Sequence, residues 1–176
     1  DEGLLKKEEI QNIPWGSNSA RVDFGAMYAH RMNVLRQAFQ RFTPDGAYET
    51  FVEQNRSWLE DYALFTALKD TLGGKPWLEW PEALRLRKAD ALAEKRRELS
   101  DEIRLQYFVQ YEFDRQWKAL RSYANAKGVR IIGDVPIYVP LDSADVWANP
   151  ELFQLDESRH PEQVAGCPPD SFTADG

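Results

Sequence analysis

The run Arg130–Val139, written RIIGDVPIYV, constrains the fold more than any other stretch of the chain. It follows Gly128, a glycine placed where the last helical pattern ends, and its apolar residues are nearly continuous. A strand covered on both faces has this composition, and a helix followed at once by such a strand is the half-unit of an α/β fold. We therefore expect an α/β protein with a buried parallel strand here.

The carboxylate of Asp134 interrupts this run where the regular part of the strand is expected to end. Ligands and catalytic groups in parallel sheets gather beyond the carboxyl ends of the strands, and the neighbouring Gly133 allows close approach of a backbone or a ligand. Asp134 is therefore a candidate site residue. The alternative is that its carboxylate accepts backbone N–H groups at a turn.

Helical periodicity covers the region from Asp23 to about Lys127. Asp23 is a predicted N-cap, and Thr43–Gly46 is a predicted break. Ser57–Glu60 has the spacing of a capping box and predicts a new helix start. These helices carry apolar faces, so the region is expected to form a helical subdomain.

Two glycines and a long apolar row mark the later helices. Gly73-Gly74 is expected to end one helix, and the longest helix is expected from Asp90 to about Lys127, with Gly128 following its end. Its second half carries apolar residues at steps of three and four: Phe113, Trp117, Leu120 and Ala124.

Trp77 and Trp80 stand between two prolines in KPWLEWP. A pair of tryptophans can form a platform on which a sugar ring stacks. The spacing of three instead places both side chains on one helix face, and buried aromatics most often serve core packing, so we favour the core.

Charge and composition exclude several classes of partner and site. The 29 acidic residues outnumber the 22 basic ones without a basic block, which argues against a nucleic-acid partner. No apolar run reaches the roughly 18 residues of a membrane span, and DEGLLKKEEI lacks the pattern of a signal peptide. The single cysteine, Cys167, allows no internal disulfide and fits a cytoplasmic location.

Asp134, Asp142 and Asp145 lie close in sequence, which raises the alternative of an oxygen-liganded metal site. Their spacing lacks the acidic loop with a central glycine that binds calcium, and neither His30 nor His160 lies nearby. We expect no metal. Asp142–Asp145 instead reads as a polar turn that caps a short helix.

Several long motifs resemble the 4-alpha-glucanotransferase family, also called amylomaltases or disproportionating enzymes. They are the segments 58–65, 75–81, 133–139, 142–153 and 164–172, in the order in which the family has them. The resemblance implies a fragment of a (β/α)₈ TIM barrel with a mainly α-helical insertion. It also implies action on α-1,4-glucans such as maltooligosaccharides, starch and glycogen, without a cofactor.

The same resemblance divides the chain into an irregular lead-in (1–22), a helical insertion (23–127) and a barrel strand with a covering loop (128–176). The family's aspartate nucleophile, glutamate acid/base and second aspartate lie on later strands, and their motifs do not occur here. Asp134 is implied to support the active site. Asp170 and Phe172, in a loop over the bound glucan, are implied to contact substrate; Ser171 departs from a common family form with an aromatic at that position.

Two functions follow as hypotheses. The first is that this chain is part of a retaining 4-alpha-glucanotransferase and is inactive alone. The second is a catalytically silent carbohydrate-binding or interaction module. Because the strand has no neighbours in this chain, we also expect either self-association through Ile131, Ile132 and Ile137 or disorder after Asp134.

Overall fold

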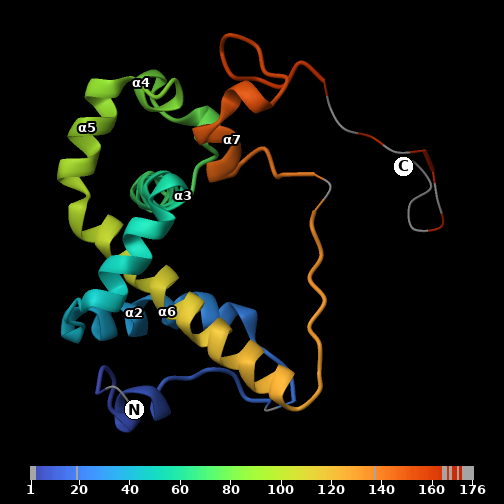
Figure 1. Ribbon diagram of the computed structural model, residues 1–176. Coiled ribbons are helices and arrows are strands. Elements are labelled where there is room, and N and C mark those ends of the chain that lie inside the picture. Colours follow the sequence, from blue (N-terminus) through green and yellow to red (C-terminus); the bar gives the residue numbers. More distant parts are fainter. Residues whose placement is uncertain are drawn as a thin grey trace. The chain divides into compact units, whose positions relative to one another are not determined.

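The computed structural model describes residues 3–18, 20–136, 138–163, 166, 168, 169 and 171 (Figure 1). Its elements are α1 (Lys7–Gln11), α2 (Phe24–Arg41), α3 (Gly46–Thr71), η1 (Trp77–Glu79), α4 (Glu82–Arg85), α5 (Ala89–Glu98), α6 (Ser100–Ala126), α7 (Ala144–Ala148) and η2 (Pro150–Leu152). No helix among the described residues has the length and apolar character that crossing a membrane requires.

The chain divides into two compact units, which are described separately. The N-terminal unit comprises Asp1–Leu59 and Arg104–Ile132. The tryptophan unit comprises Glu60–Ile103 and Gly133–Gly176.

The predicted N-cap of α2 and the predicted break at Thr43–Gly46 are confirmed. The Asp23 carboxylate accepts the backbone N–H of Ala26 at 2.9 Å, so that it caps α2. Pro44 then prevents the helix from continuing, since proline disfavours the helical conformation of the residue before it. The Asp45 carboxylate accepts the backbone N–H of Tyr48 at 2.8 Å, which satisfies one free donor in the first turn of α3.

The helix start predicted at Ser57 is wrong, because Ser57 lies inside α3. After Gly46 the sequence of α3 contains neither glycine nor proline. Phe51 and Leu59, which lie before and after Ser57, are both buried. The buried face of α3 therefore continues past the predicted start. A capping-box spacing has no consequence where the preceding turns are already helical.

Glycines in the left-handed conformation end two helices, as predicted. Gly74, with φ of 75°, donates its N–H to Lys69 O at 2.8 Å after α3. Gly128, also with φ of 75°, follows α6 in the same way. The helix expected from Asp90 is instead two helices, α5 and α6, which meet at the buried Leu99.

The core of the N-terminal unit is formed where α2 packs on the first half of α6. Ala38 on α2 and both Leu105 and Phe108 on α6 are buried there. The rings of Phe39 and Phe108 lie 5.7 Å apart, and those of Phe42 and Phe108 lie 4.9 Å apart. Aromatic pairs at these separations add to the free energy of burial.

Helix α1 is tied to α2 by an ion pair. Both Arg41 guanidinium nitrogens donate to the Glu9 carboxylate, at 2.6 and 2.7 Å. The hydrogen bonds from Arg41 and from the backbone N–H of Lys6 lower the pKa of Glu9 from 4.5 to about 2. The N-terminal segment is thus attached by charge as well as by Leu4 and Leu5.

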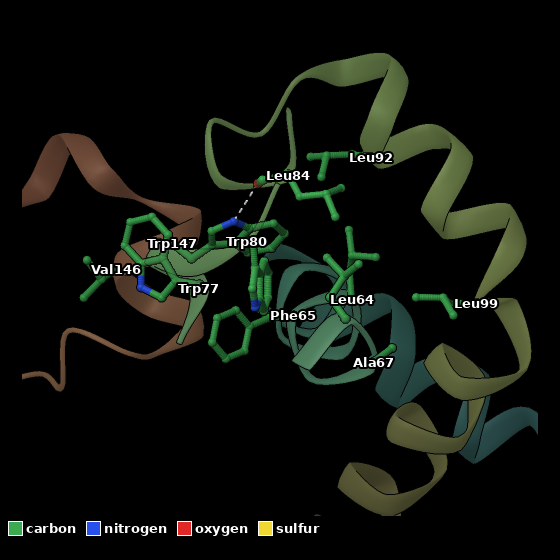
Figure 2. Close-up of a cluster of buried hydrophobic side chains, with 11 residues drawn as sticks. Leu64, Phe65, Ala67, Trp77, Trp80, Leu84, Leu92, Leu99, Val146 and Trp147 are labelled. Carbon is green, nitrogen blue, oxygen red and sulfur yellow. Dashed lines mark hydrogen bonds between the residues drawn. The ribbon is translucent and has the colours of Figure 1, made fainter. Parts of the chain in front are cut away.

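Three tryptophans form the centre of the other unit (Figure 2). Trp77 of η1, Trp80 just after it and Trp147 of α7 are each at most 3% exposed. The ring of Phe65, on α3, lies 5.3 Å from that of Trp80 and 5.8 Å from that of Trp147. The expectation that Trp77 and Trp80 belong to the core is confirmed, and a sugar platform at these residues is excluded by their burial.

Arg87 closes this cluster on one side. Its guanidinium lies 4.2 Å from the centre of the Trp147 ring and donates to Asp61 at 2.8 Å. Arg87 has a positive φ of 54°, which costs free energy for a residue with a side chain. The stacking on Trp147 and the ion pair with Asp61 offset that cost.

The strand predicted over Val129–Val139 does not form in the described residues. Ile131 and Ile132 are exposed, and the backbone there has no regular structure. A parallel strand is stable only beside other strands that pair with its N–H and C=O groups, and the described residues provide none. The isolated antiparallel bridge between Leu155 and Pro161 is the β pairing observed in the described part of the chain. Ile137 lies outside the described residues.

Replacing Trp147 with leucine is predicted to lower the free energy of unfolding by about 3–5 kcal/mol, because a buried ring and its contacts are removed. Circular dichroism during urea denaturation measures this effect. The matched control is Trp58→Leu, since Trp58 is 43% exposed, and its cost is expected to be about 1 kcal/mol or less. Equal effects of the two changes would contradict the assignment of Trp147 to the core.

Acid is predicted to weaken the attachment of α1. The folded pKa of Glu9, about 2, is below its ordinary value of 4.5, so the contribution of this carboxylate is complete above pH 4.5 and is lost as the pH falls toward 2. Glu9→Gln should flatten the pH dependence of the free energy of unfolding between pH 4.5 and about 2. The control, Glu8→Gln, should leave that pH dependence unchanged. NMR titration of the Glu9 carboxyl gives the folded pKa directly, and an ordinary value would refute the ion pair.

Candidate functional site

The structure describes one of the three predicted site residues, Asp134. Asp134 is exposed in the irregular segment between α6 and α7, with exposed Gly133 and Val135 beside it. Asp170 and Phe172 lie outside the described residues. Asp134 is therefore the one predicted site residue that can be placed, and its role as a support for substrate stays a prediction.

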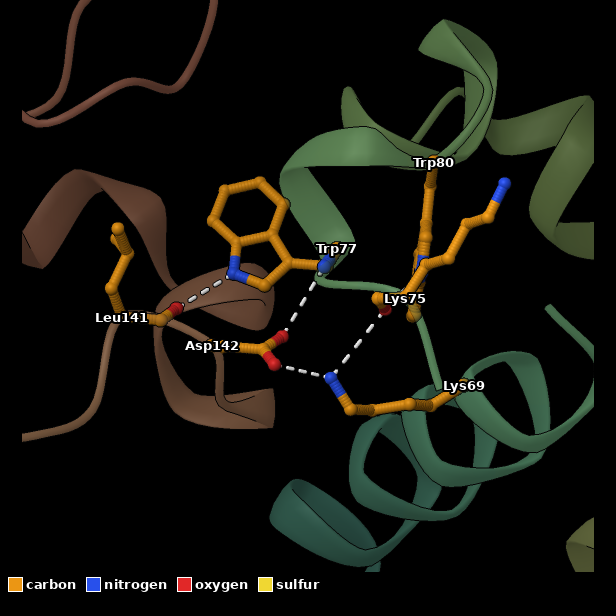
Figure 3. Close-up of polar contacts among 6 residues, drawn as sticks. All are labelled: Lys69, Lys75, Trp77, Trp80, Leu141 and Asp142. Atoms are coloured by element: carbon orange, nitrogen blue, oxygen red, sulfur yellow. Dashed lines mark hydrogen bonds and ion pairs between the residues drawn. The ribbon is translucent and has the colours of Figure 1, made fainter. Parts of the chain in front are cut away.

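The segment that carries Asp134 is anchored eight residues later by Asp142 (Figure 3). One carboxylate oxygen of Asp142 accepts the backbone N–H of Trp77 at 3.2 Å, and the other forms an ion pair with the Lys69 ammonium at the end of α3. The indole N–H of Trp77 donates to Leu141 O at 2.7 Å. We call this set of contacts the Asp142 anchor.

Lys69 and Trp80 complete the anchor from the other side. The Lys69 ammonium and the Trp80 indole N–H both donate to Lys75 O, at 3.5 and 3.0 Å. Asp142 thus meets a lysine and a tryptophan that the glycine turn after α3 brings close together (Figure 3). A carboxylate that takes a charged partner and a backbone N–H has little freedom to move.

Sequence reasoning missed the role of Asp142. We expect a polar turn at Asp142–Asp145, and the capping is confirmed, but Ser143 provides it: its hydroxyl accepts the backbone N–H of Val146 at 3.3 Å. Asp142 reaches instead to residues more than 60 positions away. The available signal was indirect, since a buried tryptophan requires an acceptor for its N–H.

An open groove lies beside α7, with a volume of about 470 Å³. We call it the α7 groove; it is lined by Val139, Leu141, Val146, Leu152, Phe153, Gln154, Leu155, Pro161 and Gln163. Its lining contains no carboxylate and no histidine among the described residues, so these residues offer no acid/base pair. Apolar side chains with two side-chain amides can contact a ligand through apolar surface and hydrogen bonds.

No cluster of three or more histidine, cysteine or acidic side chains suited to a metal ion occurs within the described residues. The expected absence of a metal and of a cofactor remains an expectation.

Comparison with known proteins identifies a family, which the geometry of the site alone does not. A family model described as 4-alpha-glucanotransferase matches residues 1–176. A 4-alpha-glucanotransferase from Clostridium butyricum is 39% identical over 179 residues, which is all of this chain and 37% of that enzyme. One from Thermus thermophilus is 48% identical over 167 residues, which is 92% of this chain and 33% of that enzyme.

The fold of this chain also matches a solved structure. It is an amylomaltase from Streptococcus agalactiae in complex with acarbose, 40% identical, with a TM-score of 0.92 over 99% of this chain. This chain belongs to the 4-alpha-glucanotransferase family. It spans about a third of the length of these relatives.

Removing the Asp142 carboxylate is predicted to loosen the segment after Asp134. Asp142→Ala should lower the free energy of unfolding by about 1–2 kcal/mol, since a backbone N–H and an ammonium lose their acceptor in a site that is partly exposed. Amide hydrogen exchange at Trp77 should accelerate. The control is Asp145→Ala, on the first turn of α7, with an expected cost of about 0.5 kcal/mol. Unchanged exchange at Trp77 in Asp142→Ala would contradict the anchor.

Proposed function

We propose that this chain is part of a 4-alpha-glucanotransferase, which transfers a segment of an α-1,4-glucan to the 4-hydroxyl of another glucan or of glucose. The observation that carries the proposal is the match of the family model over residues 1–176. The fold agreement with an amylomaltase that holds acarbose supports it. A cytoplasmic location is part of the same proposal.

The proposed reaction proceeds with retention of configuration. A retaining enzyme uses a carboxylate nucleophile and an acid/base carboxyl about 5–5.5 Å apart, on either side of the bond that breaks. The family motifs for these groups do not occur in this sequence. This chain is therefore proposed to supply substrate-binding residues and the helical insertion, while the rest of such an enzyme supplies the chemistry.

Asp134 is proposed to support the subsite where the glycosidic bond breaks. Positive charge develops on the sugar ring in the transition state, and a fixed carboxylate nearby lowers its free energy. For this role the segment 129–139 is proposed to form a strand of a (β/α)₈ barrel once neighbouring strands are present. The exposed apolar side chains of Ile131 and Ile132 support that proposal, since a barrel strand would bury them.

The loop from Val164 to Asp175 is proposed to cover the bound glucan. Asp170 can hydrogen-bond to sugar hydroxyls, and the Phe172 ring can stack on a sugar face. Ser171 replaces an aromatic side chain often found there, so the acceptor is proposed to have one stacking contact fewer. An alternative for Pro168-Pro169 is a stiff surface loop without contact to glucan.

The second candidate, a silent carbohydrate-binding or interaction module, is favoured for the isolated chain by the lining of the α7 groove, which carries no acid/base pair in the described residues. Self-association of the isolated chain through Ile131, Ile132 and Ile137 stays a prediction, which light scattering tests.

The isolated chain is predicted to leave maltotriose unchanged, because loss of even one group of a catalytic set costs several orders of magnitude in rate. A chimera in which this chain replaces the matching segment of the Streptococcus agalactiae amylomaltase is predicted to make longer and shorter oligomers from pure maltotriose. Chromatography of the products measures both. A folded chimera without transfer, or turnover by the isolated chain, would contradict the proposal.

Within the chimera, Asp134→Asn is predicted to lower kcat by about 100-fold, because the amide keeps the shape of the side chain and removes its charge. The control is Asp145→Asn, which removes an exposed carboxylate from the first turn of α7 and is expected to change kcat less than twofold. If Asp134→Asn lowers only the melting temperature, the carboxylate serves the turn and not the reaction.

A further inference from the structure

A pocket of about 470 Å³ lies in the N-terminal unit, between the end of α2 and the middle of α6. None of the predicted site residues lines it. We call it the Glu112 pocket, and its lining includes Arg41, Phe42, Asp45, Tyr111, Glu112 and Arg115. Its volume is within the range of pockets that hold small ligands.

Glu112 is the buried carboxylate of this pocket. It is only 9% exposed, and burial of a carboxylate costs free energy unless hydrogen bonds compensate for the lost water. The Arg115 guanidinium donates to it at 2.7 Å and the Gln116 side-chain amide at 3.4 Å, both to Oε2. Within the described residues no donor is found for Oε1, so this oxygen can accept a hydrogen bond from a ligand.

Asp45 is arranged in the same way. Its Oδ1 accepts the backbone N–H of Tyr48 at 2.8 Å and so caps α3. The described part of the chain places no donor on Oδ2. Two carboxylates of one pocket thus each use one oxygen in the fold and keep the other for a ligand. A carboxylate oxygen is a strong acceptor for a hydroxyl group, because O–H···O⁻ hydrogen bonds are short and charge-assisted.

Phe42 and Tyr111 supply the aromatic part of the pocket wall. Their ring centres lie 6.1 Å apart and their planes meet at 45°. Aromatic rings pack against the apolar C–H faces of sugar rings. Two glucose units joined by an α-1,4 bond are turned relative to each other, whereas β-1,4-linked units form a flat ribbon. A tilted pair of rings therefore fits the bent α-linked chain better.

The charges of the pocket lining cancel. Arg41 and Arg115 carry two positive charges, Asp45 and Glu112 carry two negative charges, and the other lining residues are uncharged. A phosphate would meet two carboxylates and an amine would meet two guanidinium groups, so like-charge repulsion disfavours both. A neutral ligand rich in hydroxyl groups fits this lining best.

We propose that the Glu112 pocket binds a short segment of an α-1,4-glucan. Sugar hydroxyls donate to Glu112 and Asp45, and a sugar ring packs against Phe42 or Tyr111. The pocket lies in the N-terminal unit, whereas Asp134 belongs to the tryptophan unit. A second contact with the same long glucan raises the effective concentration of its segments at the enzyme. The choice of an α-1,4-glucan among neutral sugars also rests on the proposed function.

Binding of maltopentaose to the isolated chain tests this proposal by NMR and calorimetry, without turnover. Amide signals around residues 45 and 112 should shift, with a dissociation constant of roughly a millimolar. Glu112→Gln should raise this constant about 10-fold or more, because a charge-assisted hydrogen bond is weakened. The matched control is Glu49→Gln, the same change at an exposed position on the first turn of α3 outside the pocket, which should leave the constant within about twofold.

Asp45→Ser provides a second test that does not depend on how Glu112→Gln folds. Serine caps a helix about as well as aspartate does, so α3 keeps its start while the pocket loses Oδ2. The dissociation constant for maltopentaose should rise about 5-fold, with little change in melting temperature. If maltopentaose leaves the amides around residues 45 and 112 unshifted, or if its affinity is unchanged in Asp45→Ser, the inference is overturned.

Two other ligands test the chemistry of the site. Cellopentaose, the β-1,4-linked counterpart, should bind the isolated chain at least about 10-fold more weakly than maltopentaose, and equal affinity would overturn the assignment to an α-glucan. Inorganic phosphate should leave the amides around residues 45 and 112 in place, and phosphate binding there would overturn the argument from charge.

The outcomes for this pocket are separable from those for the reaction. A chimera that transfers glucan, together with an isolated chain whose pocket ignores maltopentaose, overturns only this inference. A chimera that folds without transfer, while maltopentaose still binds at residues 45 and 112 of the isolated chain, overturns only the proposed function.

Discussion

The tryptophan unit depends on a single constraint: a buried indole N–H must find an acceptor. Trp77 donates to Leu141 O at 2.7 Å, Trp80 to Lys75 O at 3.0 Å and Trp147 to Leu84 O at 3.0 Å. Burial of one such ring removes 150–250 Å² from water, worth about 4–6 kcal/mol as an upper estimate. An unpaired buried N–H would cost about 1–3 kcal/mol of that gain. Each indole therefore fixes the position of the segment that carries its acceptor, and two of the three bonds join residues more than 60 positions apart.

The hydrogen bonds of these indoles restrain the chain near Asp142, but they restrain the position of Asp134 only loosely. The Asp142 anchor holds the chain eight residues after Asp134, and eight extended residues span up to about 27 Å. An anchor at that distance cannot fix a carboxylate to the accuracy that an active site requires. In the proposed barrel, pairing of residues 129–139 with neighbouring strands would supply the missing restraint. For this reason a residue with an expected place in an active site is exposed in this chain.

The parts of the fold that the sequence predicts are those decided locally. A cap at Asp23, a proline after α2 and a left-handed glycine at Gly128 act within one helical turn, and the structure has each of them. The false start at Ser57 shows the limit of such signals, since the same spacing occurs inside a helix whose preceding residues are already ordered. The strand after Gly128 was predicted from a composition that requires neighbours, and composition cannot supply them.

In the candidate site, too, the features decided locally were predicted and those that need distant partners were not. The Ser143 cap of α7 is local and was predicted, whereas the Asp142 anchor joins segments distant in sequence and was not. The burial of Trp77 and Trp80 was predicted from their spacing, but the spacing does not say that Leu141 would accept the N–H of one of them. The roles of Asp134, Asp170 and Phe172 remain predictions from a family resemblance, because the exposed Asp134 does not test one and the other two residues lie outside the described residues.

Two exposed apolar regions of the N-terminal unit differ in what contact with a partner costs. The first is a row of side chains in the second half of α6, formed by Phe113, Trp117, Leu120 and Tyr123. This row is already ordered on a helix, so covering it requires little further loss of conformational entropy. Residues 129–132 are irregular, and fixing each backbone in a strand costs about 1–2 kcal/mol before any pairing is gained. A partner that meets both surfaces gains free energy first from the row, where the side chains are in place. Strand pairing can then follow as an intramolecular step, in which closure of a short loop costs far less than a second encounter. In the proposed barrel, the ordered side chains of α6 would therefore make contact first, and residues 129–132 would pair with a neighbouring strand afterwards.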